Sequence, residues 1–264
     1  MSMLKGILFC LFVVLALANV KHGLEPPLKH PRPRKPGHAH LKYCKANTTC
    51  PPGHVPFDAV YLEAYVRTRY NDPYTGYYSL VSKKLNKYGQ FTLTNKTSEA
   101  VIVHVDIGNL VDGFTNAGSI TTYNADFPSL NHIGAVLGYG SNDSYIRFEG
   151  YNYYSLSPTT VTPKLSKPVS KGYSAYAYFT GINAPKESSI WSIVYHQFGA
   201  AGHIFPIWYN PTFGKETYNS LYWFPKENAL FGISNYVVVS EHFHKKYGRD
   251  LFYAVRVHFV YNFY

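Results

Sequence analysis

Apolar and polar side chains alternate along several short runs of this chain. In Leu251 to Phe263, every odd-numbered position is apolar or aromatic, whereas Arg256 and His258 lie among the even-numbered ones. Ala100 to Gly108 alternates in the same way, with valines and an isoleucine opposite polar residues such as His104. Because successive residues of a β-strand point to opposite faces, each run predicts a strand with one buried and one wetter face.

Aromatic and β-branched residues cluster in further short runs, which are separated by Gly, Pro, Asn and Asp. This texture is typical of strands joined by turns. We expect these further strands at residues 57–66, 76–83, 90–95, 144–149, 173–180, 189–198, 203–209 and 233–240. No run predicts a helix of ten or more residues. The pattern therefore predicts an all-β fold, either an antiparallel β-sandwich or a partly closed barrel of about ten or more short strands.

Residues 1–18 have the pattern of a cleavable signal peptide. Lys5 precedes an apolar run from Ile7 to Leu17, and Ala16 and Ala18 supply the small residues that signal peptidase requires. An uncleaved membrane anchor is the competing interpretation, but the run is shorter than the roughly 20 apolar residues that span a bilayer. We therefore expect a secreted, extracellular protein that has no transmembrane anchor.

Composition divides the rest of the chain into two parts. Residues 19–42 are rich in Pro, His, Lys and Arg and poor in apolar residues, so we expect a disordered, flexible basic tail. Residues 43–264 carry the strand pattern and are the expected β-rich domain. Within it, the proline-rich segment 157–171 either separates two lobes, 43–156 and 172–264, or is a crossover inside one domain. We favour one domain, because the first lobe alone would be small.

Export to an oxidising compartment favours a disulfide between the two cysteines that follow the signal peptide. Because Cys10 leaves with the signal peptide, we expect Cys44 and Cys50 to form a disulfide that closes a small loop. Export also makes three N-glycosylation sequons of the chain expected sites of modification. Their acceptors are Asn47, Asn95 and Asn142. The predicted mature protein is a disulfide-bonded glycoprotein.

The chain is basic, with a formal net charge of +10. Loss of Lys5 lowers the 25 Lys and Arg residues to 24, which leaves +9 against 15 acidic residues. Outside the cell, such a charge favours acidic or sulfated extracellular polymers or other matrix proteins as partners, and not nucleic acid. A soluble basic protein with no charged partner is the alternative. The expected polymer-binding residues are those of the tail, Lys21, Lys29, Arg32, Arg34, Lys35 and Lys42.

Familiar catalytic patterns are missing from the sequence. It contains no Gly-x-Ser-x-Gly elbow, no His-Glu-x-x-His pair and no phosphate-binding loop, so we predict no catalytic residues and no cofactor. His242 and His244 are the best metal-like pair, because residues two apart on an extended strand face the same side. A strand end that faces solvent is the more ordinary interpretation of this pair.

Tyrosine is the strongest compositional signal, with 26 residues. The tyrosines concentrate at positions 77–78 and 151–154, at Tyr173, Tyr176 and Tyr178, and in the last strand. Sheet packing explains many of them, but exposed ones stack on sugar rings or become cross-linked.

Three functional hypotheses follow from these features. We favour a non-enzymatic structural or extracellular-matrix-associated glycoprotein. The alternatives are a soluble recognition module, glycan-binding or membrane-surface-binding and of lectin or defence type, and a secreted enzyme of unfamiliar type. Exposed aromatic residues gathered in a concave patch would favour recognition, scattered ones a matrix role, and histidines beside acidic residues in a cleft catalysis. The sequence carries no signal for an oligomeric state.

Overall fold

The computed structural model describes most of the predicted β-rich domain. The described residues are 42–44, 54–56, 59–69, 72–105, 114–141, 143–195, 201–210, 216–247 and 252–260. They all belong to one compact unit, Pro36–Tyr264, whereas the other unit, Met1–Lys35, lies outside the described residues.

Strands make up most of the regular structure of the described residues. The first are β1 (Lys42–Cys44), β2 (His54–Pro56), β3 (Ala59–Arg69), β4 (Asp72–Leu85), β5 (Phe91–Thr94), β6 (Ile102–Val105), β7 (Phe114–Gly118), β8 (Ile120–Thr122) and β9 (His132–Leu137). The later strands are β10 (Tyr154–Thr159), β11 (Lys186–Glu187), β12 (Trp191–Tyr195), β13 (Ala201–Tyr209), β14 (Glu216–Tyr218), β15 (Ser220–Phe224), β16 (Ala229–Ile233) and β17 (Tyr253–Val260). The helices are η1 (Thr97–Glu99), α2 (Ala175–Thr180) and α3 (Tyr236–Tyr247), and none of these described helices is long and apolar enough to cross a membrane. The predicted all-β class is confirmed.

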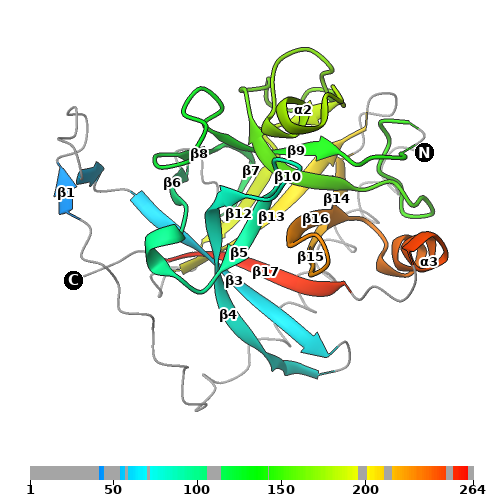
Figure 1. Ribbon diagram of the computed structural model, residues 1–264, viewed down its shortest axis with the longest axis horizontal. Helices are drawn as coiled ribbons and strands as arrows, with labels where there is room; N and C mark the ends of the chain where they lie inside the picture. Colours follow the sequence, from blue (N-terminus) through cyan, green and yellow to red (C-terminus); the bar gives the residue numbers. More distant parts are fainter. Residues whose placement is uncertain are drawn as a thin grey trace, which may run out of the picture. The chain divides into compact units, whose positions relative to one another are not determined.

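Apart from the short parallel pair β1 and β2, these strands join one antiparallel sheet (Figure 1). Its main order is β5-β4-β3-β6-β8-β9-β10-β16-β15-β17-β13-β12-β7, with β11 beside β9 and β14 beside β13. The sheet curls round because β17 also pairs with β3, where Val257 lies opposite Ala64. One residue pair, Thr121 with His132, joins β8 to β9. The strands from β3 round to β17 therefore form a partly closed barrel, one of the two predicted architectures.

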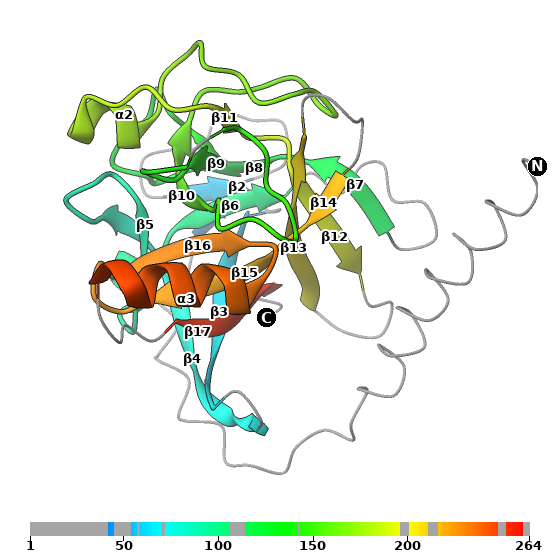
Figure 2. The ribbon, with the colours of Figure 1, turned by 90° about the vertical axis from the view of Figure 1, so that its right-hand side faces the viewer.

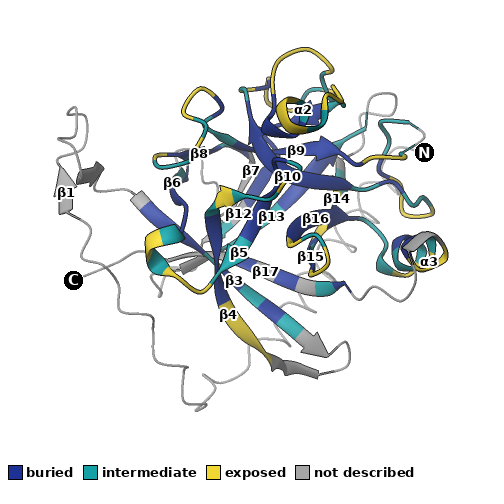
Figure 3. Ribbon diagram, viewed as in Figure 1, coloured by how far each residue is buried: buried dark blue, intermediate teal, exposed yellow. Residues whose placement is uncertain are grey.

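Alternate residues of the barrel strands bury apolar side chains in one continuous core (Figure 3). On β3 and β17 these residues are Val60, Leu62, Ala64, Val66, Val255 and Val257. Trp191 and Trp208 add two fully buried indole rings. Their N–H groups donate to the carbonyl of Ile133 at 2.7 Å and to that of Ser144 at 2.9 Å. The buried face predicted for the last strand is confirmed at Val255 and Val257.

Helix α3 covers the other face of β15 and β16 (Figure 2). Val239 and Phe243 of the helix pack against Phe224 and Phe231 of the strands and against Phe252. The ring centroids of Phe243 and Phe252 are 4.9 Å apart, and those of Phe224 and Phe252 are 4.8 Å apart. These side chains form a second apolar cluster outside the barrel.

Three of the predicted strands are wrong. Residues 173–180 contain α2, residues 233–240 begin α3, and residues 144–149 form no strand. The expectation of no helix of ten residues is also wrong, because α3 has 12. A side chain caps the first turn of each helix and favours it over a strand: Ser174 accepts from an N–H of α2, and Asn235 from an N–H of α3.

Strands from both parts of the two-lobe alternative pair with one another. β3 pairs with β17, and β10 pairs with β16. The segment 157–171 begins inside β10 and then leaves the sheet toward α2. Residues 43–156 and 172–264 therefore share one sheet.

Candidate functional site

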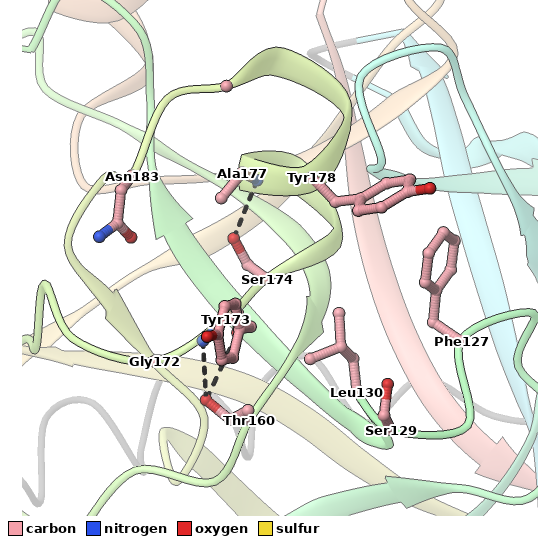
Figure 4. Close-up of a pocket in the computed structure, with 11 residues that line it drawn as sticks. Phe127, Ser129, Leu130, Thr160, Gly172, Tyr173, Ser174, Ala177, Tyr178 and Asn183 are labelled. Atoms are coloured by element: carbon pink, nitrogen blue, oxygen red, sulfur yellow. Dashed lines mark hydrogen bonds between the residues drawn. The ribbon is translucent and has the colours of Figure 1, made fainter.

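A groove beside helix α2 is the candidate functional site (Figure 4). Its volume is about 620 Å³, within the range of roughly 300–1,000 Å³ that is typical of small-molecule sites. The lining residues are Phe127, Ser129, Leu130, Thr160, Gly172, Tyr173, Ser174, Ala177, Tyr178, Gly181 and Asn183. None of these residues is charged, so the groove is an aromatic and apolar surface edged by neutral polar groups.

Hydrogen bonds to buried hydroxyl groups fix helix α2. The Ser174 hydroxyl caps the helix by accepting from the N–H of Ala177 at 3.1 Å. Under the helix, the buried Ser157 hydroxyl accepts from the N–H of Tyr176 at 3.1 Å and donates to a carbonyl of the β4–β5 turn at 2.7 Å. Gly181 ends the helix in the left-handed conformation, with φ 73°. A helix of only six residues is thereby held in place.

The chain just before α2 is tied to the end of β10. The N–H of Thr160 donates to the carbonyl of Tyr173 at 3.0 Å, and the Thr160 hydroxyl accepts from the N–H of Tyr173 at 3.3 Å. Gly172 has φ 91°, and a Cβ at this position would lie 2.7 Å from the Thr160 hydroxyl, so the link requires glycine. The backbone of Tyr173 is therefore fixed although its side chain is exposed.

Aromatic rings stand on both sides of the groove. At one edge, the ring centroids of Phe127 and Tyr178 are 5.5 Å apart, and Phe179 packs 5.6 Å from Phe127. Figure 4 shows Leu130 between Phe127 and Tyr173. Tyr173 remains 76% exposed and Tyr178 75% exposed, whereas Leu130 is buried. The groove thus presents two largely exposed phenol rings above an apolar floor.

Strand β11, which lies a few residues after the groove residue Asn183, carries two buried ionisable side chains, and neither lines the groove. Lys186 donates from Nζ to Oδ1 of Asn183 at 3.1 Å and to the carbonyl of Ser170 at 3.4 Å, and burial lowers its pKa. Burial raises the pKa of the Glu187 carboxyl group to about 9, although hydrogen bonds from the N–H of Tyr209 oppose the shift. Glu187 is therefore neutral at pH 7 and adds no charge to the site.

The predicted metal pair, His242 and His244, lies on helix α3 and not on a strand. Residues two apart on a helix point about 200° apart around the axis, so the shared-face argument for this pair is wrong. The ring of His242 stacks on Tyr151 with centroids 4.1 Å apart, and His244 is exposed. Among the residues that the structure describes, no three His, Cys, Asp or Glu side chains group as metal ligands.

Of the predicted glycosylation sites, Asn95 is exposed just after β5 and accepts from the Ser79 hydroxyl at 3.2 Å. Asn47 and Asn142 lie outside the described residues. Glycosylation therefore stays a prediction, with one acceptor in an accessible position.

The predicted disulfide and the predicted polymer-binding tail fall largely outside the described part of the chain. Cys44 is the last residue of β1, but Cys50 is not described. Lys42 is the first residue of β1. The other tail residues, Lys21, Lys29, Arg32, Arg34 and Lys35, are not described. Both expectations stay predictions.

Sequence reasoning singled out Tyr173 and Tyr178 among many tyrosines but did not bring them together, and it missed Phe127 and Asn183 entirely. One signal was available: Ser174 and Gly181 bracket residues 175–180 as a helix cap and a helix stop would. Nothing comparable marks Phe127, which reaches the groove from the distant β8–β9 loop.

Comparisons with known proteins identify no relative of this chain. The chain matches no protein-family model, and neither the curated proteins nor the solved structures include a significant match to it. Its function must be argued from the groove itself.

Proposed function

We propose that this chain is a secreted recognition protein that binds a carbohydrate in the groove beside α2. The observation that carries the proposal is the pair of largely exposed rings, Tyr173 and Tyr178, in an uncharged concave surface. Grouped aromatic residues favour recognition over a matrix role, for which scattered ones are expected. The matrix role depended on the basic tail, of which only Lys42 is among the described residues.

A sugar ring matches the chemistry of this groove. Its C–H face is apolar and packs on the face of an aromatic ring, while its hydroxyl groups need hydrogen-bond partners. Ser129 and Asn183 supply neutral polar groups at the groove edge. Because Oδ1 of Asn183 already accepts from Lys186, its NH₂ group is the part available to donate to a ligand.

The described geometry favours binding over hydrolysis. Glycoside hydrolysis ordinarily requires a pair of carboxyl groups that flank the scissile bond. None of the lining residues is Asp or Glu. The fixed backbone of Thr160 and Tyr173 also limits the conformational entropy that is lost when a ligand binds.

Substitution of the two tyrosines tests the proposal. We expect Tyr173→Ala and Tyr178→Ala each to lower the affinity for neutral oligosaccharides by about five- to tenfold, since an aromatic contact contributes about 1 kcal/mol. Isothermal titration against a panel of oligosaccharides measures this loss. The matched control is Tyr218→Ala, which removes a tyrosine that is 57% exposed and does not line the groove.

Two results would contradict the proposal. One is an intact protein that binds no member of the panel. The other is an equal loss of affinity in the Tyr218→Ala control, because that loss would separate sugar binding from the groove.

A further inference from the structure

Exposed apolar side chains concentrate in one short part of the described chain. Residues 161–182, which comprise the connection from β10 to α2, α2 itself and the residue after its C-cap, contribute six large hydrophobic residues with exposed side chains. They are Val161, Leu165, Tyr173, Tyr178, Phe179 and Ile182. Figure 3 shows this exposed surface around α2. The sugar groove accounts for Tyr173 and Tyr178 but not for Val161 and Leu165, which do not line it.

The 161–171 loop is a fixed structure with an exposed tip. Near its start, Thr162 and Ser188 exchange hydrogen bonds of 2.8 Å between each N–H and the other hydroxyl. Near its end, Val169 forms a β-bridge with Lys186. Leu165 lies between these anchors and is 56% exposed.

Leu165 also adopts an unfavourable backbone conformation. Its φ is 53°, in the left-handed region that residues other than glycine rarely occupy. Such strain persists where the surroundings enforce it, and it concentrates at functional positions. An exposed leucine held in this way at a loop tip contributes nothing to the apolar core.

The same segment contains three lysines and no acidic residue of its own. Lys164, Lys167 and Lys171 are all exposed. Between Glu149 and Glu187 the sequence contains no Asp or Glu. An apolar tip flanked by lysines is complementary to an anionic bilayer, in which apolar groups enter the interface and cationic groups contact the headgroups.

We propose that the 161–171 loop docks this protein on an anionic phospholipid surface. Val161 and Leu165 enter the interface between headgroups and acyl chains, and the three lysines contact the phosphate groups. Stable attachment of a peripheral protein needs two signals, and this loop supplies an apolar and an electrostatic one. The proposal goes beyond sugar recognition and does not depend on it.

Vesicle sedimentation of the secreted protein tests the proposal. Phosphatidylcholine vesicles with and without phosphatidylserine are used, and neither contains a glycolipid. We expect the anionic vesicles to bind the protein and the neutral vesicles to bind it at least tenfold more weakly, because three lysines contribute about fivefold each. Replacement of Lys164, Lys167 and Lys171 by Gln should weaken binding to the anionic vesicles by about tenfold or more, and the charge of the basic tail accounts for the binding that remains.

Matched controls separate the loop from the overall charge of the chain. Replacement of the exposed Lys87, Lys226 and Lys245 by Gln removes the same charge elsewhere and should change binding less than about threefold. Leu165→Asn removes the apolar tip but suits the left-handed backbone, and it should weaken binding about fivefold or more. Val237→Gln is its control, since Val237 is 54% exposed on α3.

Urea denaturation of each variant verifies that it is folded, and this check uses neither the groove nor a sugar ligand. If the loop variants bind anionic vesicles like the unmodified protein, the proposal is wrong. Equal losses in the loop and control lysine variants would also overturn it, because general charge would then explain the binding. Binding that appears only when a glycolipid is added would assign membrane contact to the groove instead.

Discussion

Helices α2 and α3 both replace predicted strands, but they differ in whether their aromatic side chains are exposed or buried. In α3, Val239 and Phe243 are buried against the strands. In α2, Tyr178 and Phe179 are exposed, although Tyr176 on the same helix is buried. Core packing therefore explains Phe243 in α3 and Tyr176 in α2, but it does not explain the exposed rings of Tyr178 and Phe179.

The two helices are also held by different forces. A cluster of buried Phe, Val, Ile and Ala side chains holds α3 against the sheet. Around α2 and the 161–171 loop the buried groups are polar: Ser157, Thr162, Ser188 and Lys186 all make hydrogen bonds there. These hydrogen bonds fix the backbone around α2 without burying its aromatic side chains. The rings of Tyr173 and Tyr178 therefore stay exposed.

The largest effect is expected in the apolar cluster. Phe243→Ala should lower the free energy of unfolding by about 3–5 kcal/mol, because it removes a buried ring that packs on several others. Tyr178→Ala should change it by less than about 1 kcal/mol, since that side chain is mostly exposed. Urea denaturation measures both values. Similar losses would show that α2 is as much part of the core as α3.

The next expected effect is a pH dependence of the free energy of unfolding, caused by the buried Glu187 of β11. Glu187 has an ordinary pKa of 4.5 and a folded-state pKa of about 9. Between these values the folded state keeps a proton that the unfolded state has lost, so stability is greatest below pH 4.5 and falls as the pH rises toward 9. The expected slope approaches about 1.4 kcal/mol per pH unit. Denaturation at a series of pH values measures it.

Glu187→Gln should flatten that dependence and stabilise the protein at alkaline pH. Glutamine has nearly the same shape and keeps an acceptor for the N–H of Tyr209. Phe243→Ala should leave the pH dependence unchanged although it lowers stability overall. An unaltered slope in Glu187→Gln would show that this carboxyl group is not the one that titrates.

Strand alternation in the sequence correctly indicated the all-β class but left sandwich and barrel as alternatives, because one face of each strand packs on an apolar core in either architecture. It predicted β6 and β17 from residues 100–108 and 251–263, and Val255 and Val257 are buried as expected. The same criterion failed at α3, where the run Val237 to Val239 favours a strand locally. The i, i+4 spacing of Val239 and Phe243 fits the apolar cluster only as a helix, and tertiary packing decided the outcome.

The groove was less predictable than the barrel. It joins Phe127 of the β8–β9 loop to Thr160 and Tyr173 of the β10–α2 connection and to Asn183 after α2, and no local pattern links these three segments. The high tyrosine content predicted exposed aromatic side chains, but it did not predict which of them would lie close together. Tyr154 shows the difficulty, because it belongs to the densest tyrosine run but is fully buried and stacks on Trp208 with centroids 5.3 Å apart.

The smallest expected effect is the loss of a helix-capping side chain. It tests the difference between the two helices directly, because a capping side chain begins each of them. Ser174 caps α2, and Asn235 caps α3 by accepting from the N–H of Val237 at 3.0 Å. Replacing either residue by Ala should cost about 1 kcal/mol of stability. Only Ser174→Ala should also weaken sugar binding, because the first turn of α2 positions Tyr178 in the groove, whereas α3 contributes no lining residue. Urea denaturation combined with titration of the oligosaccharide separates the two quantities. Equal stability losses with binding lost in Ser174→Ala alone would show that the site requires Ser174, which both caps α2 and lines the groove. Binding lost in both variants, or in neither, would show that the order of this helix does not control the groove.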